Sequence, residues 1–103
     1  MITRGTTPTI TFSLPYDTKL FKVIWVTFSQ NDKEVFTVET ENLSLIGKEV
    51  KLTVTQEQTL LLDNDKNVDI QLRVLTQKDN AITSNIIKTS VGRILKEGVI
   101  SEL

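Results

Sequence analysis

The chain has 103 residues, enough for one domain around a single hydrophobic core, and its 12 basic and 13 acidic side chains give a formal net charge of −1. It contains no cysteine and no histidine, which excludes disulfides, thiolate nucleophiles, Cys/His zinc sites and imidazole acid–base chemistry. Proteins that bind nucleic acid usually concentrate positive charge, so nucleic acid is not expected as a partner.

No segment approaches the ~18 apolar residues of a membrane span, and residues 1–6 lack the apolar core of a signal peptide. We therefore expect no signal peptide, no transmembrane segment and no membrane partner. Threonine, valine and isoleucine together supply 35 of the 103 residues. Because β-branched side chains suit a pleated surface and lose rotamer freedom in a helix, this composition predicts mostly β-strands.

The first part of the chain predicts three strands. Apolar and polar residues alternate over residues 9–14, which is typical of a half-exposed strand. Residues 21–28 are apolar on both faces, so that strand is either central or covered by another chain. Asn31-Asp32 tolerates the positive φ of a two-residue hairpin turn and leads into a strand over residues 34–40.

The second part predicts four more strands and one helical turn. Short strands are expected at residues 43–45 and 49–54, and a capping box of Thr and Gln then predicts a helical turn near residues 56–61. Residues 68–74 give the clearest alternation of the chain. The following segment changes phase near Ile86, which predicts a β-bulge and a bent last strand.

Six to seven short strands with one helical turn predict an all-β protein with an immunoglobulin-like β-sandwich. A small open β-barrel is the alternative, because periodicity fixes the faces of strands and not the order of a sheet. We assign residues 1–91 to a single β-sandwich domain and residues 92–103 to an apolar carboxy-terminal arm.

Two features of the sequence are candidates for a protein interface. Trp25 is either the core plug of the sandwich or, with Tyr16, Phe21 and Phe28, part of an aromatic platform for a sugar or a protein. The arm is too apolar for a free tail, so it should dock on its own sandwich or on a neighbouring chain. The candidate interface residues are Trp25, Ile94, Leu95, Val99, Ile100 and Leu103.

No motif for catalysis or metal binding stands out. The oxygen-bearing residues of segment 63–69 alternate as in a calcium loop, but Val68 stands where that loop needs glycine and Val74 where it needs glutamate. No spacing sets a nucleophile beside a base, and the glutamates fall on turns or polar faces. We predict no catalytic residue, no cofactor and no metal, and a protein that is not an enzyme.

The sequence resembles a family of proteins of similar length that are encoded by phages and prophages of Gram-positive, often gut, bacteria. The resemblance is carried by Arg4-Gly5-Thr6-Thr7-Pro8-Thr9 with Phe12, Leu14, Pro15 and Asp17, by Phe28-Ser29-Gln30, by residues 52–60, by Gln71-Leu72-Arg73-Val74 and by residues 84–95. It implies a virion structural protein of the tail, baseplate or neck, and no active site.

On this basis we expect a non-enzymatic structural or assembly protein of the virion, made in the cytoplasm of the bacterial host. It should form homo-oligomers and contact other virion proteins, because a lone sandwich without chemistry acts through its surfaces. The alternative is a free immunoglobulin-like binding module for a cell-wall glycan or a host protein.

Overall fold

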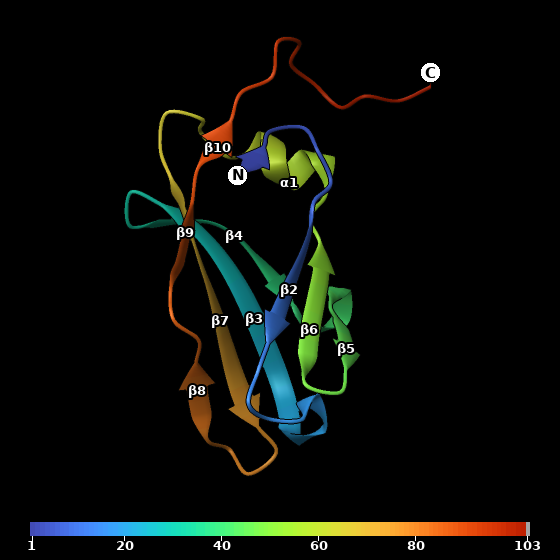
Figure 1. Ribbon diagram of the computed structural model, residues 1–103, viewed down its shortest axis with the longest axis vertical. Coiled ribbons are helices and arrows are strands. Elements are labelled where there is room, and N and C mark those ends of the chain that lie inside the picture. Colours follow the sequence, from blue (N-terminus) through green and yellow to red (C-terminus); the bar gives the residue numbers. More distant parts are fainter. Residues whose placement is uncertain (103) are drawn as a thin grey trace.

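The computed structural model describes residues 1–102, which form two facing β-sheets and a short parallel ladder at one end (Figure 1). The strands are β1 (Ile2–Thr3), β2 (Thr9–Ser13), β3 (Phe21–Gln30), β4 (Lys33–Glu39), β5 (Ser44–Ile46), β6 (Glu49–Thr53), β7 (Val68–Thr76), β8 (Ala81–Thr83), β9 (Ile87–Thr89) and β10 (Val91–Gly92). The helical segments are the 3₁₀ turns η1 (Thr18–Leu20) and η2 (Thr40–Asn42) and the α-helix α1 (Gln56–Leu60).

One sheet has the order β2-β6-β5, and the other has the order β4-β3-β7-β8, with β9 also paired to β7. All of these pairs are antiparallel, whereas β1 and β10 pair in parallel. Over residues 1–102 the ladders do not close into a barrel. The predicted immunoglobulin-like β-sandwich is therefore confirmed, in preference to the small barrel.

The core lies between the two sheets and follows the alternation of the strands. The inward residues of β3 are Ile24, Val26 and Phe28, all with no exposed surface. The predicted inward positions of residues 49–54 and of β7 are likewise buried, namely Val50, Leu52, Val54, Val68, Ile70, Leu72 and Val74. The ring of Phe28 also stacks on Phe36 of β4, with 4.4 Å between the centroids.

The local signals of the sequence are confirmed where they specify a turn or a cap. Asn31 and Asp32 have φ values of 54° and 63° and join β3 to β4 as a two-residue hairpin turn. Thr55 accepts a hydrogen bond from the backbone of Gln58 at 3.1 Å, and the Gln58 side chain accepts one from the backbone of Thr55 at 3.0 Å. This capping box begins α1, the predicted helical turn.

The predicted bent last strand is divided into β8 and β9. Both pair with β7, but their registers along β7 differ by one residue, as a bulge requires. Between them, Ser84 bonds to Leu72 twice, through its backbone N–H and its hydroxyl group. The phase change near Ile86 is therefore confirmed. The short pair of β1 and β10 was not predicted, and Gly92 belongs to it.

Of the two alternatives left open for Trp25, the core plug is wrong. Its side chain lies on the outer face of the sheet and is 42% exposed, and the guanidinium carbon of Arg73 stands 5.5 Å from its ring centroid. Trp25 and Arg73 are directly opposed in the β3–β7 register, so they share a face. The four-residue aromatic platform is wrong too, because Phe21 and Phe28 are buried.

We predict opposite outcomes for two aromatic residues of β3. Phe28→Ala should lower the free energy of unfolding by about 3–5 kcal/mol, because it opens a cavity in the core. Trp25→Ala should cost less than about 2 kcal/mol, since it removes a half-exposed ring and one cation–π contact. Urea unfolding of both variants measures the difference, and equal losses would contradict the outward placement of Trp25.

Candidate interaction surfaces

The described part of the arm that follows β10, residues 93–102, has no regular secondary structure and runs past α1 at one end of the molecule (Figure 1). Ile94 is half-buried, whereas Leu95 is 93%, Val99 48% and Ile100 79% exposed. Leu103, the last of the predicted interface residues, lies outside the described residues. The arm therefore shows most of its apolar side chains to solvent.

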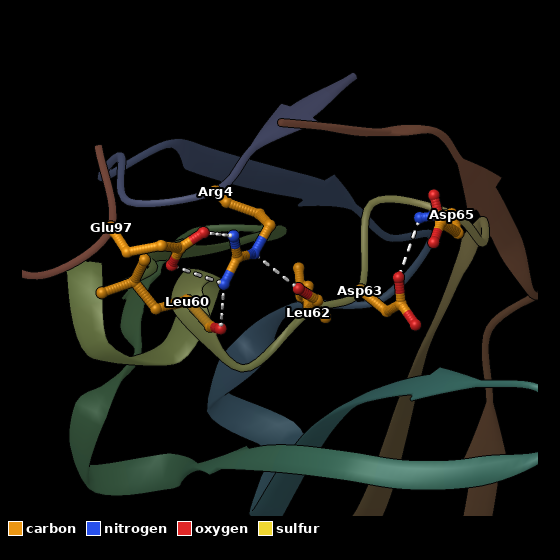
Figure 2. Close-up of polar contacts among 6 residues, drawn as sticks. All are labelled: Arg4, Leu60, Leu62, Asp63, Asp65 and Glu97. Atoms are coloured by element: carbon orange, nitrogen blue, oxygen red, sulfur yellow. Dashed lines mark hydrogen bonds and ion pairs between the residues drawn. The ribbon is translucent and has the colours of Figure 1, made fainter. Parts of the chain in front are cut away.

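Arg4 connects the arm to the sandwich (Figure 2). Its Nε donates to the carbonyl oxygen of Leu62 at 2.8 Å, and its Nη2 donates to the carbonyl oxygen of Leu60 at 3.0 Å. The same Nη2 donates to Glu97 Oε2 at 3.0 Å, and Nη1 donates to Glu97 Oε1. We call these four residues the Arg4 junction. Its geometry suits a guanidinium, which presents several donors in one plane.

The junction supplies hydrogen-bond donors to two backbone carbonyl groups and to the carboxylate of Glu97. The last carbonyl groups of a helix accept no hydrogen bond inside it, so the carbonyl group of Leu60 at the end of α1 gains a cationic donor from Arg4. The carbonyl group of Leu62, two residues past the helix, gains one as well. The hydrogen bond from Arg4, together with its positive charge, lowers the pKa of Glu97 and outweighs the opposing effect of desolvation. The same bond raises the pKa of Arg4. Both groups are therefore held in their charged forms.

A second contact fixes the far part of the arm. The Gln56 side chain accepts a hydrogen bond from the backbone N–H of Ile100 at 2.8 Å and donates one to its carbonyl oxygen at 3.2 Å. This amide takes both backbone groups of one residue, as a neighbouring strand would. Only the backbone of Ile100 is used, so its side chain stays exposed.

The near part of the arm packs on Gly5. A Cβ atom at Gly5 would lie 3.2 Å from Ile94 Cδ1 and 3.6 Å from Leu60 Cδ2, and Gly5 has a φ of +73°. Glycine is required here both for the left-handed backbone and for the close approach of Ile94. Ile94 is thus the arm residue that docks on its own sandwich. Sequence reasoning treated it like the other apolar residues of the arm.

A groove lies between the end of β2 and β8, towards the end of the molecule opposite α1 (Figure 1). It has a volume of about 570 Å³ and continues into a hollow of about 320 Å³. Tyr16, Phe21 and Ile82 line both parts, and we call the two together the β2–β8 groove. Its other lining residues are Ser13, Leu14, Pro15, Leu20, Leu72, Val74, Thr76, Gln77, Lys78, Asn80, Thr83, Ser84 and Asn85.

Trp25 belongs to a different surface from the arm. It lies in the middle of β3 and lines a hollow of the outer face, together with Thr27, Glu34, Thr37, Glu39, Gln71 and Arg73. The arm crosses the end that carries α1 (Figure 1). The predicted interface residues are thus divided between two places, and within residues 1–102 the structure does not bring Trp25 and the arm together.

Two carboxylates of the loop considered for calcium, those of Asp63 and Asp69, have other partners. Asp63 accepts a hydrogen bond from the backbone of Asp65 at 2.9 Å (Figure 2), and Asp69 forms an ion pair with Lys88 at 3.0 Å. Among residues 1–102 no group of three or more His, Cys, Asp or Glu side chains could hold a metal ion. None of the helices in this range is long and apolar enough to cross a membrane.

The two facing sheets define an immunoglobulin-like β-sandwich. A comparison with solved structures supports this class of fold. The chain is similar to the immunoglobulin-like domain of mouse leukocyte-associated immunoglobulin-like receptor 1, solved as a strand-swapped dimer, with a TM-score of 0.52. The alignment covers 92% of this chain and 86% of that one, at 13% sequence identity, and so concerns the fold alone. Comparison with protein families and with curated proteins gives no match.

Sequence reasoning did not find the residues that anchor the arm. Arg4 is one of 12 basic residues and Gln56 lies in an ordinary first turn of a helix, so neither carries a local signal. Their partners Glu97 and Ile100 are 93 and 44 residues away.

We predict that Arg4→Lys lowers the free energy of unfolding by about 1–3 kcal/mol, because one ammonium cannot serve two carbonyl groups and a carboxylate in the same plane. Denaturant unfolding measures the loss. Arg93→Lys, which changes an exposed arginine of the arm, is the matched control and should stay within about 0.5 kcal/mol of the parent. Equal effects of the two substitutions would show that the junction is not a specific contact.

The lowered pKa of Glu97 predicts a pH dependence. A glutamate whose pKa is lower in the folded state adds stability above its unfolded pKa and loses it as pH falls through the folded pKa. The parent should therefore be more stable than Glu97→Gln at neutral pH, and the difference should vanish below the ordinary range of a glutamate. Unfolding curves of both proteins between acid and neutral pH test this, and a constant difference would contradict it.

Proposed function

We propose that the chain is a non-enzymatic virion structural protein that associates with itself and with other virion proteins in the tail, baseplate or neck. The sequence resemblance to a phage protein family supports the virion context. The observation that carries self-association is the arm, which is anchored by the side chain of Glu97 and the backbone of Ile100. The side chains of Leu95, Val99 and Ile100 stay exposed.

The energetics of the arm favour such an interface. Full burial of each of these three side chains contributes about 1.5–3 kcal/mol. Anchoring to Arg4 and Gln56 has already removed part of the arm's conformational freedom, so a partner that binds it loses less entropy. An immunoglobulin-like domain of similar fold was solved as a strand-swapped dimer, which is consistent with association through an exchanged segment.

A second candidate function rests on the exposed side chain of Trp25. An indole ring beside hydroxyl, amide and carboxylate groups is a surface on which a sugar can stack and form hydrogen bonds. A free binding module for a cell-wall glycan or a host protein would use this face and not the arm. Such a module would stay monomeric, and a bound glycan would quench the fluorescence of Trp25.

Two measurements test the proposed function. Mass spectrometry of purified phage particles should detect the chain as a component with a fixed copy number. Light scattering of the purified protein should show an oligomer. Replacing Leu95, Val99 and Ile100 by serine should raise its Kd about tenfold or more, because a tenfold change corresponds to about 1.4 kcal/mol and the three buried side chains together contribute more than that.

The matched control replaces Leu45 and Ile46, exposed apolar residues of β5, by serine, and it should leave the oligomer unchanged. A monomeric parent whose Trp25 fluorescence responds to cell-wall glycan would favour the binding module. Absence of the chain from particles would reject the virion role.

A further inference from the structure

We propose that the arm of one copy docks in the β2–β8 groove of a second copy, which makes the association head-to-tail. This inference rests on the self-association proposed above and names the surface that the arm binds. It starts from two features of the same chain: the arm has apolar side chains that face solvent, and the β2–β8 groove is lined by apolar side chains that could cover them.

The groove is built to receive apolar side chains. Its floor is formed by core residues Phe21, Leu72 and Val74, and its rim by Tyr16 and by Leu20. Tyr16 and Leu20 are about half exposed in one copy, although both are large and largely apolar. Exposed apolar surface around a hollow is typical of a binding site. A second chain would cover these two side chains.

The acidic end of the described arm complements the charge of the groove. Lys78 is the charged residue that lines the groove, at the end formed by the β7–β8 turn. Beyond Gly98 the described arm has two apolar residues, Val99 and Ile100, followed after one serine by the acidic residue Glu102. An arm segment with its apolar residues in the groove can therefore place Glu102 towards Lys78. Among residues 1–102, no carboxylate side chain lines the groove to oppose it.

The geometry makes this contact intermolecular. The bonds from Gln56 hold Ile100 at the end of the molecule that carries α1. The groove is lined by residues from the end of β2, from β8 and from the β7–β8 turn, and these elements lie towards the opposite end of a body 46 Å long (Figure 1). An arm held in this way cannot occupy its own groove. Contacts between two different surfaces are heterologous, so they produce a ring when the rotation closes and a helical filament when it does not.

Cysteine cross-linking tests the proposal directly, because the native chain has no cysteine. Val99→Cys protein is mixed with Thr83→Cys protein, which carries the thiol at the groove, or with Ile46→Cys protein, whose exposed site on β5 is the control. A disulfide requires Cα atoms within ~7 Å, so the groove pair should give about tenfold more mixed dimer than the control pair on oxidation.

A charge exchange provides an independent readout. Lys78→Glu should weaken self-association about two- to fivefold, as expected for one exposed ion pair, and the double variant Lys78→Glu with Glu102→Lys should restore it. Lys78 lies in an exposed turn, so the fold is not at risk. Failure of the double variant to restore the affinity would overturn the assigned contact.

The outcomes separate this inference from the proposed function. Equal cross-linking at the groove and at β5 in a protein that still associates would overturn the groove and leave self-association standing. A protein that is monomeric by light scattering would overturn both.

Discussion

The guanidinium of Arg4 is the contact on which the α1 end of the molecule depends. It joins three segments that are far apart in sequence, the residues after β1, the end of α1 and the arm. The parallel pair of β1 and β10 brings these segments together, and the backbone N–H of Arg4 extends it with a 2.9 Å bond to the carbonyl oxygen of Gly92. Buried Thr59 adds a link, since its hydroxyl donates to the carbonyl oxygen of Thr6 at 2.9 Å.

These contacts give the arm an unusual balance. The carboxylate of Glu97 and the backbone of Ile100 bond to the arm's own sandwich. The side chains of Leu95, Val99 and Ile100 are exposed. A segment that folded back only for stability would be expected to bury its apolar side instead. The arm is therefore held in position while its apolar side chains stay exposed, and the proposed assembly role rests on this asymmetry.

Much of the sandwich could be predicted because its signals are local. The alternation of β7 gave its buried face, the Asn31-Asp32 pair gave the hairpin turn, and the Thr55 to Gln58 spacing gave the start of α1. Even the phase change near Ile86 was visible, as a one-residue change of register along β7. Each of these features is set by neighbours within a few residues, so a single sequence contains the information.

The sequence by itself thus determined the class of fold, most strands and the apolar character of the arm. Tertiary structure alone decided which face Trp25 takes, because a strand apolar on both sides is oriented only by pairing, here with Arg73 opposite. It also decided where the arm is anchored, since Arg4 and Gln56 find their partners across the chain. Periodicity fixes the faces of an element, whereas contacts between distant segments depend on register and packing, which no local pattern records.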